Sequence, residues 1–91
     1  MNHKEKDLKT ISLLEELVQK KGYELRYDKI TGFRFDGAFC RIETKKLIVV
    51  DKKLPEKTKI KVLIDILNSI GVEDVFIPPM LEEYFRGGDK W

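Results

Sequence analysis

Residues 33–70 read FRFDGAFCRIETKKLIVVDKKLPEKTKIKVLIDILNSI and contain the segments that decide the fold. Residues 47–50 are apolar on both faces, which is typical of a strand in the centre of a sheet or covered on both sides. Pro55 then fits the first position of a helix, where its missing N–H costs no hydrogen bond. Apolar side chains recur at helical spacing in residues 60–70, so the sequence predicts a long buried helix that ends at Gly71.

The segment before this stretch predicts a helix followed by a strand. Residues 7–21 carry an apolar stripe at three- and four-residue steps, made by Leu8, Ile11, Leu14 and Val18. Asp7 fits the cap of this helix, and Gly22 fits its left-handed end. Residues 23–28 then alternate apolar and polar side chains, as a half-buried strand does. A helix and a first strand therefore precede the central strand.

The remaining segments complete a predicted α+β fold. Residues 33–42 also alternate and predict a middle strand, whose Gly37 indicates a bulge. Residues 75–77 could add a short edge strand, and the apolar positions of residues 80–85 indicate a closing helix. We therefore predict an N-terminal helix, a three-stranded antiparallel β-meander, a long second helix and a short C-terminal helix. These form a single domain over residues 1–91, with 1–6 and 87–91 mobile.

Charge and cysteine content narrow the functional classes. The 18 basic and 16 acidic side chains nearly cancel to a net charge of +2, so no global field attracts nucleic acid. A single cysteine excludes an intramolecular disulfide and suits a reducing cytosol. Residues 1–7 lack the apolar core of a secretory signal, and the longest aliphatic run is far shorter than the roughly 20 residues that span a bilayer. We therefore predict a cytoplasmic protein that does not enter the membrane.

Residue types that carry chemistry are few. Cys40 shares a strand face with Ala38 and Ile42, whereas the adjacent Arg41 points to the other face and cannot lower the pKa of the thiol. Cys40 therefore fits a small core residue better than a nucleophile. His3 is the only histidine, and a zinc site needs three or four ligands. We predict no catalytic residue, no metal site and no cofactor.

A lysine-rich segment offers a candidate for binding nucleic acid or another anion. Residues 45–61 hold seven lysines and two acidic side chains. Lys45 and Lys46 precede the central strand and Lys52 and Lys53 follow it, so the two pairs are separated by roughly 20 Å. The segment has no arginine for base readout and no aromatic side chain for stacking. A solubilising surface is the competing interpretation.

The C-terminal aromatic residues form a second candidate site. Tyr84 and Phe85 lie in the predicted closing helix, and Trp91 is the only tryptophan. Trp91 either folds back onto the domain or serves as an anchor for a partner or a second copy of the chain. The three aromatic residues are the predicted partner-binding set.

Three segments resemble a group of short, functionally uncharacterised bacterial proteins: residues 37–42 (GAFCRI), 46–51 (KLIVVD) and 54–57 (LPEK). That group has a strand with the motif Gly-x-Cys-Arg, an Ile/Val-rich strand that ends in Asp, and a helix. Its closing Pro-x-x-x-Glu segment is matched here by residues 79–83 (PMLEE). The resemblance implies no particular activity.

A more remote resemblance is to the core of zinc peptidases of the ImmA/IrrE type, which share the order strand, turn, strand, helix. In those enzymes the helix carries His-Glu-x-x-His, which supplies two zinc ligands and a base. The matching helix here reads KVLIDILN over residues 61–68 and has no histidine. The resemblance therefore implies a degenerate, non-catalytic relative.

Three functional hypotheses follow from the sequence. The leading one is a small cytosolic binding or assembly module that works without catalysis and contacts an unidentified protein or a second copy of itself. The second is nucleic-acid binding through the lysines of residues 45–61. The third is an enzyme whose site is completed by another chain, with carboxylates such as Asp36 or Asp51.

Overall fold

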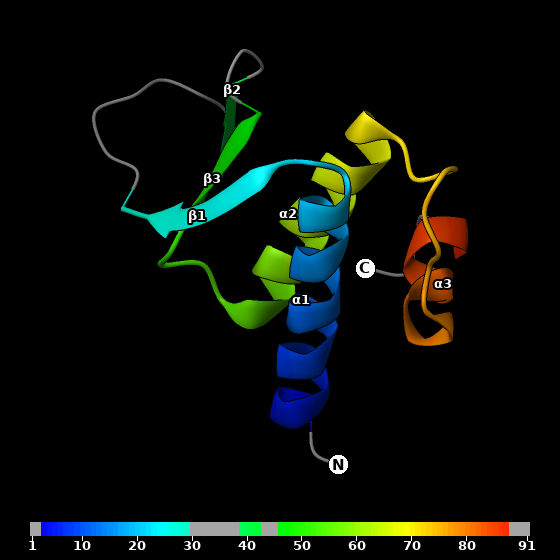
Figure 1. The fold of residues 1–91 in the computed structure, drawn as a ribbon. Helices are drawn as coiled ribbons and strands as arrows, with labels where there is room; N and C mark the ends of the chain where they lie inside the picture. Colours follow the sequence, from blue (N-terminus) through cyan, green and yellow to red (C-terminus); the bar gives the residue numbers. More distant parts are fainter. Residues whose placement is uncertain (1–2, 30–38, 43–45, 88–91) are drawn as a thin grey trace.

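The computed structural model describes residues 3–29, 39–42 and 46–87. The elements follow one another as α1 (His3–Lys20), β1 (Glu24–Asp28), β2 (Phe39–Ile42), β3 (Leu47–Asp51), α2 (Glu56–Ile70) and α3 (Pro79–Gly87). Figure 1 shows the sheet on one side of the α1–α2 pair and α3 on the other side. The chain is therefore α+β with three helices among its described residues, in agreement with the predicted class and helix order.

The predicted three-stranded antiparallel meander is wrong. The strand order is β1-β3-β2, with β1 parallel to β3 and β2 antiparallel to β3. Because β3 is apolar on both faces, it takes the central position, and β1, with one apolar face, lies at an edge. A meander would instead place β2 in the centre. The chain between β1 and β3 is longer than the dozen or so residues that a parallel connection requires.

The register of the parallel pair determines which side chains meet the helices. Leu25 lies beside Ile48, and Tyr27 lies beside Val50. The two β3 residues are buried, and the two β1 residues pack against the same core. The charged residues of β1 occupy the alternate positions and are exposed. One face of β1 therefore closes the core, and the other face of β1 carries charge.

The buried core is shared by all three helices and the central strand. It consists of Ile11, Leu14, Leu17 and Val18 of α1, Ile48 and Val50 of β3, Ile60, Val62, Leu63, Ile64, Ile66 and Leu67 of α2, and Leu81 of α3. α1 packs along α2, and α3 packs against α2. Since α2 has neighbours on several sides, most of its circumference is apolar, as the sequence indicated.

The buried side of α1 differs from the predicted stripe. The helix begins at His3 rather than at a cap on Asp7. Leu8 is 49 % exposed, whereas Leu17, outside the predicted stripe, is fully buried. Asp7 and Thr10 continue the buried side toward the N-terminus at the same three- and four-residue steps. The contact line is therefore rotated away from Leu8.

The two buried polar side chains of α1 both have partners. The carboxylate of Asp7 lies 3.4 Å from Nζ of Lys57 in α2. The hydroxyl of Thr10 donates a hydrogen bond of 2.8 Å to the carbonyl of Lys6, one helical turn earlier. A buried polar group costs little when it is paired in this way. The core is therefore not purely apolar.

Glycine ends both long helices, as predicted. Gly22 has a φ of +88° after α1, and Gly71 has a φ of +99° after α2. The Gly71 N–H donates to the carbonyl of Leu67 at 2.8 Å and satisfies one of the last free acceptors of α2. Pro55 precedes α2 as its cap residue, one position before the predicted one, with a φ of −61° and a ψ of 156°.

Candidate interaction surfaces

Phe76 has the most exposed large apolar side chain in the described part of the chain. Its side chain is 72 % exposed. It lies in the connection between α2 and α3, where residues 75–77 do not form the strand suggested by their sequence. Val75 and Ile77 pack against the core, so the connection is held by its aliphatic residues and presents the aromatic ring to solvent.

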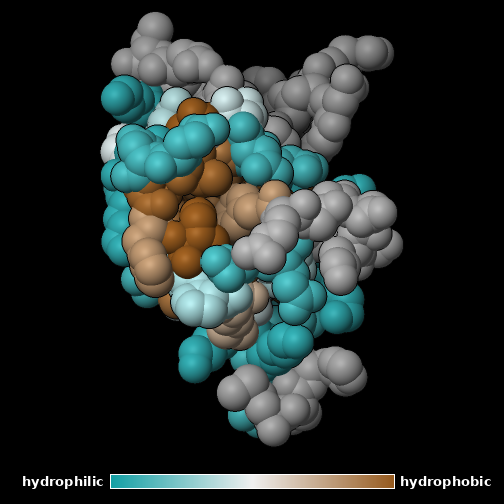
Figure 2. Space-filling view, turned by 90° about the vertical axis from the view of Figure 1, so that its right-hand side faces the viewer, coloured by the Kyte–Doolittle hydropathy of each residue, from teal (hydrophilic) through white to brown (hydrophobic). Residues whose placement is uncertain are grey.

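Further apolar side chains of the same segment are only partly buried. Val72 packs partly against the core, and Met80 at the start of α3 is half-buried. Figure 2 views the molecule from the side on which α3 lies and shows apolar side chains gathered there, bordered by hydrophilic ones. We call residues 71–87, which comprise this connection and α3, the C-terminal arm. A contiguous apolar area with a polar border is typical of an interaction surface.

The connection is held in place at both ends and in the middle. Gly71 begins it in a left-handed conformation that disfavours other residues. Nζ of Lys21, at the end of α1, donates a hydrogen bond to the carboxylate of Asp74. The N–H of Leu81 donates to the carbonyl of Pro78 at 2.8 Å and starts α3. These contacts fix the backbone that carries Phe76.

The C-terminal arm is acidic although the whole chain is weakly basic. It holds Glu73, Asp74, Glu82 and Glu83 against Arg86, a net charge of −3. The hydrogen bond from Lys21, and then a hydrogen bond to the backbone of Asp74 itself, lower the pKa of the Asp74 carboxyl. Asp74 is therefore ionised throughout the neutral range. The apolar surface around Phe76 thus lies within a region of negative charge.

The predicted partner-binding residues lie elsewhere on the same arm. Tyr84 and Phe85 are half-buried on α3 and pack against the core. They therefore help to attach α3 to the domain. Trp91 lies outside the described residues. The sequence reasoning missed Phe76 because the apolar run of residues 75–77 was interpreted as a short edge strand. The signal that pointed to a loop was the pair of breakers around it, Gly71 and the two prolines at 78–79.

The lysines of the predicted anion site do not form one patch. Lys46 precedes β3, and its carbonyl accepts a hydrogen bond of 2.8 Å from the N–H of Glu24. Lys52 follows β3, and its N–H donates to the carbonyl of Asp28 at 2.9 Å. Lys46 and the Lys52-Lys53 pair are thus at opposite ends of the central strand, as predicted, and Lys45 lies outside the described residues.

A rigid turn presents Lys52 and Lys53 at the end where β1 and β3 finish. We call residues 52–55 the lysine turn. The carboxylate of Asp51 accepts a hydrogen bond of 3.0 Å from the N–H of Lys53, and its carbonyl accepts one of 3.3 Å from the N–H of Leu54. Asp51 therefore has a structural role in the turn. Asp36, the other carboxylate of the enzyme hypothesis, lies outside the described residues.

Tyr27 links the sheet to both long helices. Its hydroxyl donates a hydrogen bond to the carboxylate of Glu15 in α1, and Nζ of Lys59 in α2 lies 5.2 Å from the centroid of its ring. Burial, followed by the hydrogen bond to Glu15 and the charge of that residue, raises the pKa of Tyr27. The phenol is therefore neutral at physiological pH and acts as a clamp between three elements.

Two further sequence predictions concern residues with special chemistry. Cys40 pairs with Val49 in the register of the sheet, but its side chain is outside the described part of the structure, as is that of His3. Nowhere in residues 3–29, 39–42 and 46–87 do three His, Cys, Asp or Glu side chains gather in a way that could hold a metal ion. Within the same ranges, no helix is long and apolar enough to cross a membrane.

Comparison with known proteins leaves the two sequence resemblances as predictions. No family model matches the chain, and no curated protein or solved structure matches it.

Proposed function

We propose that this chain is a small binding or assembly module that acts without catalysis, and that its contact surface is centred on Phe76. The observation that carries the proposal is the 72 % exposure of this ring on a connection whose neighbouring aliphatic residues are anchored in the core. Aromatic residues that a partner buries supply much of the energy of protein interfaces. The single cysteine of the sequence suits a cytosolic site of action.

The energetic argument depends on how much burial is left for a partner. Complete burial of a phenylalanine side chain is worth about 1.5–3 kcal/mol relative to leaving it in water. Because most of the Phe76 side chain is exposed, most of that gain is not realised within the chain. Val72 and Met80 of the same arm are also only half-buried, so apolar area in addition to Phe76 is left for a partner.

The rigidity of the connection also supports an interaction role. The ion pair between Lys21 and Asp74, the hydrogen bond from the Gly71 N–H to the Leu67 carbonyl, and the buried Leu81 restrict the backbone on both sides of Phe76. An anchor that is already held in place loses less conformational entropy on binding than a mobile one. This supports a surface adapted for binding rather than an aromatic ring that is exposed by chance.

The test is co-purification from cells that naturally contain the chain, with Phe76→Ala compared with the matched control Leu8→Ala. Leu8 is the other exposed large apolar residue of the described structure, at 49 % exposure. It lies in α1, outside the C-terminal arm. We expect a partner to be retained by the wild type and by Leu8→Ala and to be lost with Phe76→Ala. Equal retention by all three proteins would contradict the proposal.

Nucleic-acid binding through Lys45, Lys46, Lys52 and Lys53 is a separate proposal with less support. Lys46 lies at the other end of β3 from Lys52 and Lys53, so a single phosphate track cannot contact all of them closely. Fluorescence polarisation with labelled single- and double-stranded oligonucleotides at low salt tests it. Binding that weakens steeply with salt and is lost in Lys52→Ala/Lys53→Ala would support this alternative.

A further inference from the structure

We propose that the surface around Phe76 accepts a second copy of this chain, and that the second copy contributes its lysine turn. This inference rests on the proposed function, because it names the partner of the same surface. Three observations carry it: opposite charges on two regions of the chain, apolar residues at the centre of each region, and the positions of the two regions on opposite sides of the molecule.

The C-terminal arm and residues 51–61, the segment that contains the lysine turn, have equal and opposite net charge. The C-terminal arm carries a net charge of −3, and residues 51–61 carry five lysines against Asp51 and Glu56, a net charge of +3. In the basic region, Lys57 contacts Asp7 and Lys59 lies over Tyr27, whereas Lys52 and Lys53 are exposed on the turn. In the arm, Asp74 is paired with Lys21, and Glu73, Glu82 and Glu83 are exposed. Complementary charge of this kind steers association and fixes its orientation.

Each region also presents apolar atoms at its centre. In the arm, Phe76 is exposed and closely follows the acidic pair Glu73 and Asp74 in the sequence. In the lysine turn, Leu54 is half-buried and Pro55 is exposed, directly after the two lysines. The Phe76 ring of one copy can therefore cover Leu54 and Pro55 of the next while lysines meet carboxylates around them. Such an arrangement has the apolar centre and polar rim of a protein interface.

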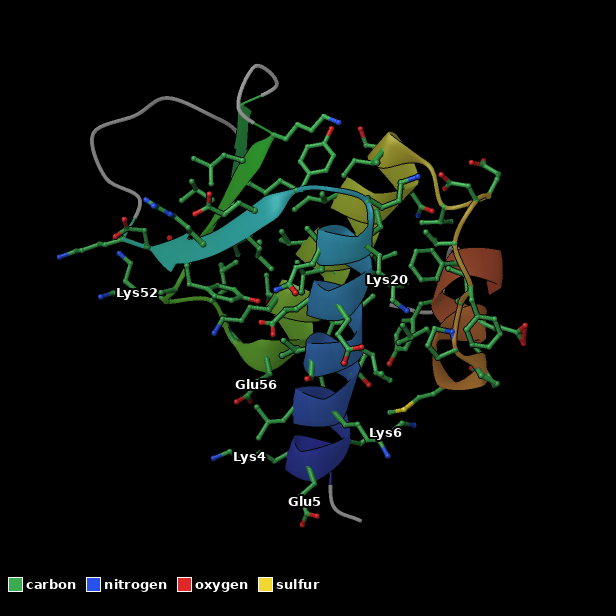
Figure 3. The ribbon with its side chains drawn as sticks, viewed as in Figure 1. Lys4, Glu5, Lys6, Lys20, Lys52 and Glu56 are labelled. Carbon is green, nitrogen blue, oxygen red and sulfur yellow. The ribbon has the colours of Figure 1, made fainter. Side chains whose placement is uncertain are left out.

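The two regions lie on opposite sides of the molecule, so one copy cannot satisfy its own surfaces. Figure 3 labels Lys52 at the end of the sheet that is far from α3, and Figure 1 shows α3 on the other side of the α1–α2 pair. A contact between two different surfaces is heterologous, and it joins copies head to tail. A two-fold contact centred on Phe76 would instead bring two acidic arms together.

Both surfaces are held in shape before contact. Hydrogen bonds to Asp28 and Asp51 fix the lysine turn, and the ion pair between Lys21 and Asp74 fixes the connection that carries Phe76. Little ordering is therefore required when two copies meet. The interface is small and charged, so the structure predicts association that is weakened by salt, because screening shortens the range of the attraction.

The experiment uses two variants that each remove one side of the contact. Phe76→Ala removes the aromatic centre of the arm, and Lys52→Glu/Lys53→Glu reverses the charge of the lysine turn. Lys4→Glu/Lys9→Glu is the matched control, because it makes the same change in net charge at two exposed positions of α1, outside both regions in the sequence. Sedimentation velocity over a range of concentrations at low and high salt measures association, and circular dichroism confirms that each variant is folded.

We expect the wild type and the control to associate with increasing concentration at low salt and to dissociate at high salt. Each contact variant alone should associate at least about tenfold more weakly. An equimolar mixture of the two contact variants should form a dimer, because Phe76→Ala retains an intact lysine turn and Lys52→Glu/Lys53→Glu retains an intact arm. Only a head-to-tail contact predicts this rescue.

Three results would overturn the inference, and they differ in what they say about the proposed function. A wild type that stays monomeric at low salt rejects the second copy but leaves a different protein as the partner. Association that is lost in Phe76→Ala but unchanged in Lys52→Glu/Lys53→Glu indicates contact between two arms, so the surface stands and its occupant changes. Association that is unaffected by Phe76→Ala rejects both the inference and the surface.

Discussion

The α1–α2 pair and the C-terminal arm are attached to the same core in very different ways. Together, α1 and α2 bury ten apolar side chains in the core, whereas the arm buries Leu81 alone and adds half-buried residues around it. α1 and α2 also pack along each other, while α3 meets the rest of the chain through α2. The helix pair is therefore the stable part of the domain, and the arm is its least supported element.

The difference indicates why the candidate surface lies on the arm. Most apolar side chains of α1 and α2 close the core, so few of them remain to contact a partner. The arm keeps Phe76 in solvent and holds its backbone through one ion pair and one buried leucine. Four predictions test the contrast, in order of decreasing effect.

The largest effect is expected from truncation of a core leucine in α2. Leu63 and Leu81 are both fully buried, the first in α2 and the second in the arm. Leu63→Ala should lower the free energy of unfolding by about 3–4 kcal/mol, because it leaves a cavity that packed neighbours cannot close. Leu81→Ala should cost about 2 kcal/mol, since the arm can shift to fill the space. Chemical denaturation measures both values.

Hydrogen exchange separates the two variants further. In Leu81→Ala, amides of α3 should exchange faster while those of α1 and α2 keep their protection. In Leu63→Ala, protection should fall in all three helices together. Equal costs for the two variants, with uniform loss of protection in both, would show that the arm is an integral part of the core and would remove the contrast.

The joint between the two regions should be the next most sensitive position. Gly71 has a φ of +99° and a ψ of 135°, a combination that side chains rarely adopt, and a Cβ there would lie 3.0 Å from Oε1 of Glu73. We expect Gly71→Ala to cost about 2 kcal/mol, because the backbone must change or stay strained. Thermal and chemical denaturation measure the loss.

Gly22→Ala is the matched control for this position. Gly22 also has a positive φ, of +88°, but a Cβ there would have no neighbour within 4 Å. The cost at Gly22 therefore reports the backbone conformation by itself. We expect it to be smaller than the cost at Gly71 and to leave association unchanged, whereas Gly71→Ala should also weaken association. A larger loss at Gly22 would contradict the importance of the joint.

The contacts of Tyr27 with α1 and α2 make the stability of the helix pair dependent on pH, which can be tested. Because the pKa of Tyr27 is raised in the folded chain, the unfolded chain loses its phenolic proton first as the pH rises above about 10. The stabilisation of the folded chain by protonated Tyr27 is therefore complete below that pH and is lost above it. Tyr27→Phe should cost about 1 kcal/mol at neutral pH through the lost hydrogen bond to Glu15.

Urea denaturation between pH 8 and about 11 measures this dependence. The wild type should lose stability more steeply than Tyr27→Phe above about pH 10. Glu15→Gln should give an intermediate slope, because it removes the carboxylate but leaves Tyr27 buried. Equal slopes of stability against pH for all three proteins would show that unfolding is not coupled to the loss of the Tyr27 proton.

Local signals in the sequence were sufficient for the helices and the central strand. Apolar spacing identified α1, α2 and α3, and Gly22 and Gly71 marked the ends of the first two. Residues 47–50 are apolar on both faces, which favoured a strand that is central or covered on both sides, and β3 is central in the sheet. The predicted meander, which would place this strand at an edge, was wrong. Each of these signals depends on neighbours within a few residues.

Features that depend on distant pairing could not be predicted in the same way. The parallel pairing of β1 with β3 is decided by which edge of the sheet the intervening chain reaches, and no residue in either strand encodes it. Asp7 is buried because Lys57 lies beside it, although the two are far apart in sequence. The exposure of Phe76 likewise follows from where the connection runs after α2. Lys46 and the Lys52-Lys53 pair, by contrast, lie at opposite ends of β3 as predicted, because one strand separates them.

The smallest effect is expected from the ion pair that holds the arm against α1. The hydrogen bond from Lys21 lowers the pKa of Asp74 below its ordinary value, so the stabilisation is present at neutral pH and is lost as the pH falls toward and below about 4. The Asp74 side chain is 73 % exposed, so water and salt screen the pair and its contribution to stability is small. Asp74→Asn should therefore change global stability slightly and should mainly increase hydrogen exchange in residues 72–77.

Glu73→Gln, at the adjacent exposed position, is the control and should leave that exchange unchanged. A difference in stability between wild type and Asp74→Asn that persists at low pH would mean that the carboxylate charge is not what holds the connection, and the attachment of Phe76 would then depend on Gly71 and Leu81 alone.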